Sequence, residues 1–192
     1  MINSKEDYLE FIKYEEDNYR NSYPNFTLEL TRILKFQKLL RKLEYYTNCK
    51  KSIVIKWILN RKFDRLSNKY CFHIPLNTID KGFCIVHIGP IYINDHACIG
   101  KNVRIHPMTT IGKNIGISLD SPIIDDGVWI GPGARVYGPI HIGKNVVIGT
   151  NSVVNKDFPD NVTIAGVPAK IINKKGYTDY FKNDWLFIFI RL

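Results

Sequence analysis

The spacing of apolar residues changes near residue 70. Before that point, apolar residues recur at helical spacing in three stretches: around Tyr8–Tyr14, from about Thr27 to Tyr46, and from about Lys51 to Leu66. Pro24 lies between the first two stretches, where it should end or delay a helix. We therefore predict a helical subdomain over residues 1–70. The later two stretches are also rich in Lys and Arg. Their basic faces are expected to be exposed to solvent, and the alternative is that they bind an anionic membrane surface.

From Ile79 onward the apolar period is six. A short strand followed by a tight turn gives this period if each aliphatic points into a continuous core, as in a parallel β-helix of stacked repeats. Gly often follows the aliphatic directly, as in Ile130-Gly131, and we expect it to allow a turn conformation that a side chain would hinder. The twelve aliphatic positions are Ile79, Ile85, Ile93, Ile99, Ile105, Ile111, Ile124, Ile130, Val136, Ile142, Ile148 and Val154.

Two interruptions break this period. Ile85 and Ile93 are eight positions apart, with His87 at the start of the slip, and Ile111 and Ile124 are thirteen positions apart. A regular β-helix has flat faces, and loops on a rigid scaffold often carry function. We therefore expect a pocket and the chemistry at these interruptions.

Composition narrows the class of protein. The chain has 192 residues and a net charge of +9, which fits one globular domain with an appendage and an anionic partner. The basic residues form no recognisable DNA-reading motif, so we predict no nucleic acid partner. Four cysteines without a CxxC pair and an acidic N-terminus without an apolar signal core predict reduced thiols and a cytoplasmic protein. No apolar run is long enough to span a membrane, and no metal-ligand cluster is evident, so we expect no metal.

Residues 71–172 resemble the hexapeptide-repeat acyltransferases, and most closely the serine acetyltransferases and their relatives in bacterial surface-polysaccharide clusters. The resemblance implies a mainly β fold, a left-handed parallel β-helix, with the helical subdomain 1–70 before it and a C-terminal tail 173–192 after it. It also implies acetyl-CoA as co-substrate and a homotrimer with donor grooves between protomers. The motifs that carry it are His73-Ile-Pro, Ile85-Val-His87-Ile-Gly89, the Ile-Gly repeats and the closing Ala165-Gly-Val-Pro-Ala-Lys170.

The resemblance assigns roles to particular side chains. His87 matches the catalytic base of the family, since a neutral imidazole can take a proton from the acceptor hydroxyl. His106 either lines the acceptor site or occupies a turn, whereas His141 is expected to be structural. The positions that contact coenzyme A in the family fall on Lys113, Pro132, Thr150 and Lys170.

The acceptor is predicted from departures from the family pattern. Serine acetyltransferases carry an Asp upstream of the His, an Asp directly before it and an Arg-His pair later; here those positions read Phe72, Val86 and Asp120-Ser121. Buried charges need partners, so we expect a neutral acceptor: an O-acetyltransferase acting on a sugar hydroxyl of a surface polysaccharide or its precursor. The alternatives are a serine O-acetyltransferase of cysteine biosynthesis and a non-catalytic β-helix scaffold. The residue that orients His87 is not identified from the sequence.

Overall fold

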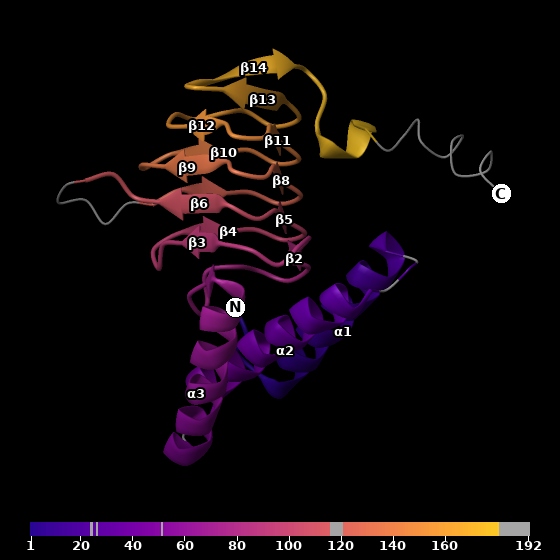
Figure 1. Cartoon of the computed structure of the whole chain (residues 1–192), viewed down its shortest axis with the longest axis vertical. Coiled ribbons are helices and arrows are strands. Elements are labelled where there is room, and N and C mark those ends of the chain that lie inside the picture. Colours follow the sequence, from indigo (N-terminus) through magenta and orange to yellow (C-terminus); the bar gives the residue numbers. More distant parts are fainter. Residues whose placement is uncertain (24, 26, 51, 116–120, 181–192) are drawn as a thin grey trace.

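Three helices lead into a stack of short strands (Figure 1). The computed structural model describes residues 1–23, 25, 27–50, 52–115 and 121–180. The helices are α1 (Lys5–Ser22), α2 (Leu28–Asn48) and α3 (Ile53–Tyr70). The strands are β1 (Phe72–His73), β2 (Cys84–Ile85), β3 (Ile91–Ile93), β4 (Cys98–Ile99), β5 (Arg104–Ile105), β6 (Thr109–Gly112), β7 (Ile123–Ile124), β8 (Trp129–Ile130), β9 (Arg135–Tyr137), β10 (His141–Ile142), β11 (Val147–Ile148), β12 (Val153–Val154), β13 (Thr163–Gly166) and β14 (Ala169–Asn173).

Local signals fix where the helices begin and end. The Ser4 hydroxyl accepts the Asp7 N–H at 2.9 Å and starts α1, and Thr27 caps α2 by accepting the Leu30 N–H at 3.2 Å. Helix α1 ends at Ser22, ahead of Pro24 as expected. Helix α3 runs four residues further than predicted and ends where Cys71 takes a left-handed conformation, with φ at 58°.

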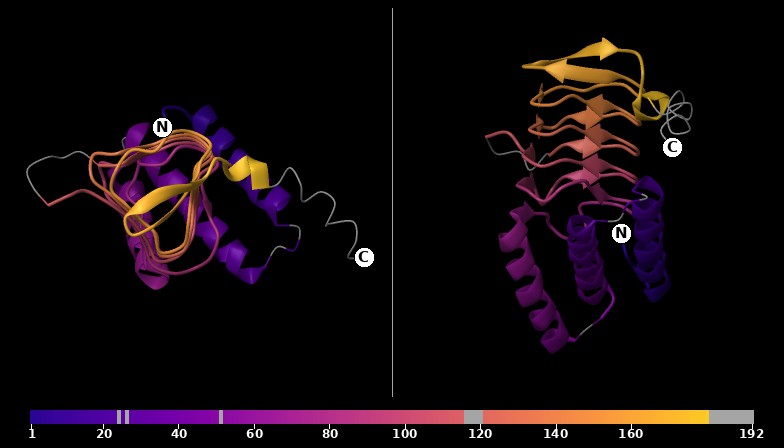
Figure 2. Two further views of the ribbon diagram at one scale, coloured as in Figure 1. Left: turned by 90° about the horizontal axis from the view of Figure 1, so that it is seen from above. Right: turned by 45° about the vertical axis from the view of Figure 1, so that its right-hand side comes forward.

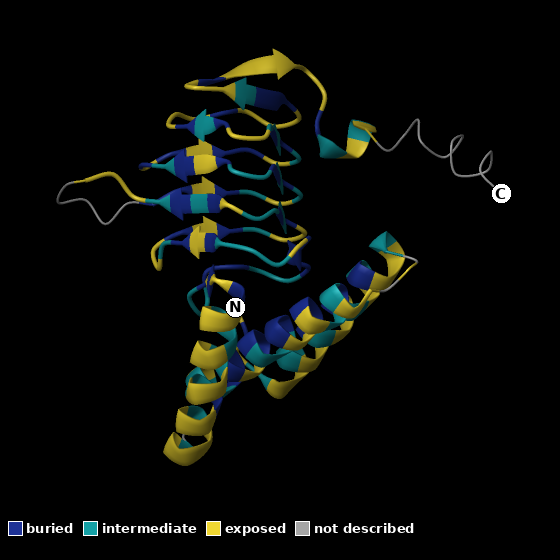
Figure 3. Ribbon diagram, in the orientation of Figure 1, coloured by how far each residue is buried: buried dark blue, intermediate teal, exposed yellow. Residues whose placement is uncertain are grey.

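The strands form the expected left-handed parallel β-helix. They stack as three sheets in the orders β1-β3-β6-β9-β12, β10-β7-β4 and β14-β13-β11-β8-β5-β2, parallel throughout except between β13 and β14. Ile124 pairs with Ile142, 18 residues along the chain, so one coil is three repeats (Figure 2). All twelve aliphatic positions of the repeat are buried, none more than 5% exposed, and buried positions recur on every coil (Figure 3). The six-residue period therefore predicted the core correctly.

The role expected for the glycine after each aliphatic was wrong. Gly131 and Gly143 lie outside the left-handed region that favours glycine, so they are not needed for a special turn conformation. They are needed for close stacking instead: a Cβ on Gly131 would meet the carbonyl oxygen of Ile148 at 2.8 Å, and one on Gly143 would meet the backbone nitrogen of Asp160 at 2.6 Å. The left-handed turn positions are shared between asparagines, such as Asn102 and Asn145, and other glycines, such as Gly127 and Gly133.

The helices cover the open end of the β-helix. Strand β2 lies at the edge of its sheet, where backbone groups lack a strand partner. The Tyr19 hydroxyl donates to the Ile85 carbonyl and accepts the Ile85 N–H, both at 2.8 Å, and the Gln37 amide donates to the Phe83 carbonyl at 2.8 Å. Helices α1 and α2 thus supply the hydrogen bonds that a further coil would have supplied.

A buried charge cluster fastens the same junction. The guanidinium of Arg41, whose side chain is 1% exposed, donates to Glu15 at 2.7 and 3.0 Å and to Glu44 at 3.0 Å. It also donates to the carbonyls of Ile79 and Asp80, both at 2.8 Å. Burial by itself would lower the pKa of Arg41, but the two carboxylates outweigh burial and raise it. For Glu15 burial is the larger influence, and it raises the pKa of that carboxyl although the guanidinium acts in the opposite direction.

Helices and coils share one hydrophobic core. The Phe36 ring of α2 packs edge-on against Phe72 of β1, with centroids 5.0 Å apart, and stacks on Phe63 of α3 at 5.3 Å. Because the core is continuous across residue 70, the division into separate domains at that residue stays a prediction. The part of the C-terminal tail from residue 181 lies outside the described residues.

One apolar face of α3 is not covered. Ile53, Val54 and Trp57 are 83%, 69% and 59% exposed, although the sequence pattern placed them on the apolar face of a helical subdomain. Arg61 lies over the Trp57 ring, 5.1 Å from its centroid. Among the helices described, none has the length and apolarity that crossing a bilayer would require.

Candidate active site

The turns that follow β2, β5, β8 and β11 stack on one corner of the β-helix. The Val86 N–H donates to the Ile105 carbonyl at 3.1 Å, and the Gly131 N–H donates to the Ile148 carbonyl at 2.9 Å. Further along the same turns, the Gly133 N–H bonds to Pro107 at 3.0 Å. This corner therefore carries four of the predicted site residues: His87, His106, Pro132 and Thr150.

His87 is exposed and has a carboxylate beside it. Its side chain is 61% exposed, and its Nδ1 lies 3.4 Å from Oε2 of Glu29. The other oxygen of Glu29, Oε1, accepts the Ile88 N–H at 2.8 Å. Glu29 belongs to the first turn of α2, so the helical segment contributes a charged group directly beside the predicted base.

His106 is half-buried and differs in its surroundings. Its Nδ1 lies 2.9 Å from the Ile130 carbonyl, which requires the proton on Nδ1, and its ring packs at 4.6 Å against Trp129 of β8. Burial lowers the pKa of His106, and the nearby His87 and Arg104 lower it further, against the effect of the carbonyl contact. The lowered pKa favours the neutral ring of His106, and no hydrogen bond to its Nε2 is found among the described residues.

The remaining predicted positions lie elsewhere. Lys113 directly follows β6, which belongs to a different sheet, so within one chain it is not on the corner of His87. Lys170 is exposed on β14 and pairs with Ala165 in the closing hairpin. His141 lies on a third sheet, with Nε2 3.0 Å from Oδ2 of Asp125, an ion-pair geometry that fits its expected structural role.

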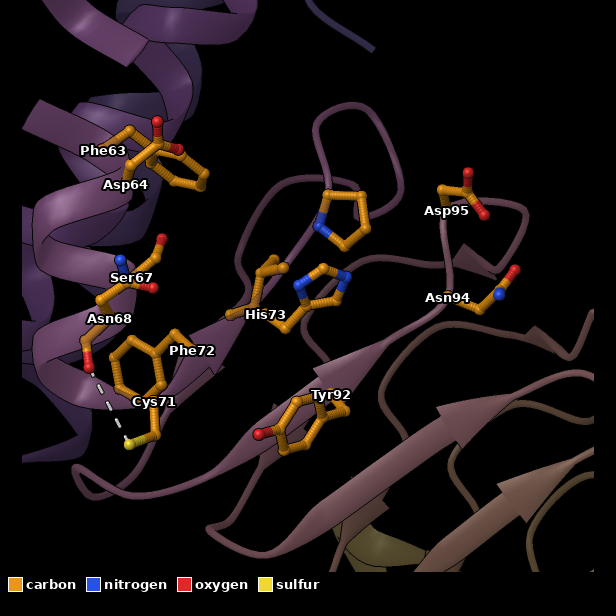
Figure 4. A pocket seen from close by; sticks show the side chains of 12 residues that line it. Phe63, Asp64, Ser67, Asn68, Cys71, Phe72, His73, Tyr92, Asn94 and Asp95 are labelled. Carbon is orange, nitrogen blue, oxygen red and sulfur yellow. Dashed lines mark hydrogen bonds between the residues drawn. The ribbon is translucent and has the colours of Figure 1, made fainter. Parts of the chain in front are cut away.

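A hollow of about 860 Å³ lies against a different face, between the end of α3 and the first coils (Figure 4). His73 and Tyr92 project into it with their rings 6.1 Å apart, and Asp64 and Asp95 add negative charge. His87 is not among the residues that line it. His87 therefore lies on an exposed corner outside this hollow, and the pocket expected at the interruptions stays a prediction.

Comparisons of the sequence with known proteins found similarity to transferases. The family described as bacterial transferase hexapeptide (six repeats) matches residues 121–156. The serine acetyltransferase of Buchnera aphidicola subsp. Acyrthosiphon pisum (strain APS) is 36% identical over 131 residues, which are 65% of this chain and 48% of that protein. The chain thus spans about half the length of this curated relative.

Solved structures extend the likeness to the fold. The soybean serine acetyltransferase apoenzyme superimposes with a TM-score of 0.74 at 25% identity, covering 88% of this chain and 70% of that chain. The chain resembles the serine acetyltransferases. A serine acetyltransferase in complex with CoA also superimposes, with a TM-score of 0.68 at 24% identity over 88% of this chain and 70% of that one, which supports the shared fold.

The contact of Glu29 with His87 was not predicted from the sequence. Glu29 lies 58 residues before His87, and nothing in the helical pattern around it indicates that it reaches the β-helix. The sequence does place Glu29 two residues after Thr27, a residue type that often caps helices. This pattern predicts where a helix begins, but it does not predict what that end of the helix contacts.

Proposed function

We propose that the protein transfers an acetyl group from acetyl-CoA to a hydroxyl, with His87 as the general base. The observation that carries this proposal is the exposed imidazole of His87, whose Nδ1 contacts Glu29 and whose Nε2 has no hydrogen-bond partner within the described part of the chain. The likeness to serine acetyltransferases in sequence and in fold supports the same reaction class.

In this reaction Nε2 of His87 accepts the proton of the acceptor hydroxyl as the oxygen attacks the thioester carbonyl. The tetrahedral intermediate collapses with loss of the CoA sulfur, which receives the proton back from the imidazolium. The products are an O-acetyl ester and free CoA thiol. A positioned base contributes about 10²–10⁴-fold to the rate of such a step.

Serine is the acceptor that the comparisons favour, because the relatives found are serine acetyltransferases. This reverses the preference for a sugar hydroxyl reached from the sequence. A sugar hydroxyl stays the second candidate on one observation: Phe72 and Val86, which replace two aspartates of the family pattern, are both buried and offer no charge to an amino acid. Acetyl transfer itself is common to both acceptors.

The donor site is proposed along the corner that carries Pro132 and Thr150, with Lys170 near the phosphates. A CoA complex exists for a serine acetyltransferase of the same fold, which supports a CoA groove here. Lys113 lies on another corner, so it would reach this groove only from a second copy of the chain. That separation supports the proposed homotrimer.

Transfer is best measured by the loss of the thioester ultraviolet absorbance of acetyl-CoA, with serine, free sugars or oligosaccharides as acceptors. A thiol reagent is unsuitable at high protein concentration because Cys71 and Cys98 are exposed free thiols. We expect thioester loss that depends on serine, and a kcat at least about 10²-fold lower in His87→Ala. His141→Ala, which changes an exposed imidazole on another sheet, is the matched control and should leave kcat unchanged.

The outcomes separate the two parts of the proposal. Thioester loss with a sugar but not with serine would overturn the acceptor and keep the reaction. A His87→Ala variant with normal turnover would overturn the base. Absence of acceptor-dependent thioester loss across the whole panel would overturn acetyl transfer.

A further inference from the structure

The contact between Glu29 and His87 has two parts that together define an orientation. Oε1 of Glu29 is fixed by the Ile88 N–H at 2.8 Å, next to His87 in the chain. Oε2 is then held 3.4 Å from Nδ1 of His87. One carboxylate thus bridges the backbone and the ring of the same turn, so a rotation of the ring away from this geometry loses the contact.

The position of Glu29 is itself fixed by the fold. Leu30 and Ile33, directly after it on α2, are buried in the core shared with the coils. Thr27 closes the first turn by accepting the Leu30 N–H. Negative charge is favoured at this end of a helix by the helix dipole, so a carboxylate suits the place.

A carboxylate can only accept a hydrogen bond, and this decides the tautomer of the ring. With Glu29 at Nδ1, the proton of neutral His87 belongs on Nδ1, and Nε2 keeps the lone pair that a base needs. The carboxylate also stabilises the imidazolium that forms when Nε2 takes a proton. Such a carboxylate acts through the histidine and does not touch the substrate.

We propose that Glu29 is the positioning residue of His87, holding its tautomer and orientation from helix α2. This inference rests on the proposed function, since it gives the base of that reaction its partner. It also explains why Phe72 is tolerated where the family pattern has an upstream aspartate. The helical segment then contributes to the reaction through His87, beyond covering the end of the β-helix.

Glu29→Gln is the sharpest test because it keeps the shape of the side chain. Its amide oxygen can still accept the Ile88 N–H, but its NH₂ group then faces Nδ1 and turns Nδ1 into an acceptor. The proton moves to Nε2 and the base is blocked. We expect kcat to fall about 10²–10⁴-fold, with the KM for acetyl-CoA little changed. Glu29→Asp, which keeps the charge, should retain more activity than Glu29→Gln.

Nitrogen NMR of the imidazole tests the tautomer without any assay of activity. In the neutral ring of the full chain, His87 should be protonated on Nδ1, and Glu29→Gln should move the proton to Nε2. Glu16→Gln is the matched control, since Glu16 pairs with Lys38 on the helices and should leave the His87 signals unchanged. An unfolded variant would be recognised by loss of the dispersed spectrum, and Glu29→Asp then serves as the second variant.

These readouts also separate the two proposals. A wild-type His87 with mixed tautomers, or signals that Glu29→Gln leaves unaltered, would overturn the role of Glu29 whatever the activity. If the Nδ1 proton is observed but no acceptor is acetylated, the orientation by Glu29 stands and the proposed reaction fails. If acetyl transfer is normal in Glu29→Gln, His87 needs no positioning by this carboxylate.

Discussion

Replacing Arg41 with methionine removes the centre of the buried charge cluster without leaving a large cavity. Two carboxylates, Glu15 and Glu44, then stay buried without their cation, and the carbonyls of Ile79 and Asp80 lose their donor. Breaking a buried ion pair by removing one partner costs about 3–5 kcal/mol. Since two backbone carbonyls lose bonds as well, we expect the free energy of unfolding to fall by about 5 kcal/mol at neutral pH.

The loss should depend on pH in a defined direction. The pKa of Glu15 is already raised by burial in the presence of Arg41, and without the guanidinium it rises further. A carboxyl whose pKa is raised in the folded state costs little stability while it is protonated. As pH rises through that pKa the buried group becomes charged, and the free energy of unfolding falls. The destabilisation by Arg41→Met should therefore be larger near pH 8 than near pH 5.

Urea unfolding followed by far-ultraviolet circular dichroism at both pH values measures this loss. Lys38→Met is the matched control, because Lys38 forms a partly exposed ion pair with Glu16 on the same two helices and should cost less than about 1 kcal/mol. A loss below about 1 kcal/mol in Arg41→Met, or a loss that is equal at both pH values, would refute the argument that buried charge fastens the helices to the coils.

Two further predictions concern the core and the donor site. Ile130→Ala opens a cavity between the stacked Ile105 and Ile148 and should cost about 2–5 kcal/mol in urea unfolding; a loss under about 1 kcal/mol would mean that the stack does not depend on this position. Lys170→Ala should raise the KM for acetyl-CoA several-fold while largely sparing kcat, measured by thioester loss with Lys101→Ala as the exposed control. An unchanged KM would remove Lys170 from the donor site.

Much of the fold could be predicted from the sequence because a β-helix repeats one local rule. Each coil places an aliphatic inward at every sixth residue, so twelve positions report the same geometry independently. The role of Gly131 could not be predicted in this way, because a sequence pattern does not distinguish a turn that needs glycine from a neighbouring coil that leaves no room for Cβ. The exposure of Trp57 could not be predicted either, because an apolar helix face in a sequence does not indicate whether another part of the protein packs on it.

The candidate site was only partly within reach of the sequence. His87 was predicted because it coincides with a slip in the repeat and matches the catalytic histidine of the family, and His106 because it follows an inward aliphatic and precedes a proline. Glu29 was not found, since its contact with His87 joins a helix end to a β-helix turn 58 residues away. Such a contact depends on how α2 packs against the first coils, which no local period encodes.

The number of residues between paired positions differs from coil to coil, and this difference indicates where the chain can gain or lose residues during evolution. Ile130 pairs with Ile148, 18 residues away, but Ile105 pairs with Ile130, 25 residues away, because the longer connection between β6 and β7 lies between them. Loop-closure entropy grows only with the logarithm of length, so the extra residues cost about 0.3 kcal/mol. Changing the length or the sequence of that connection should therefore be nearly neutral for folding while the stacked core stays unchanged.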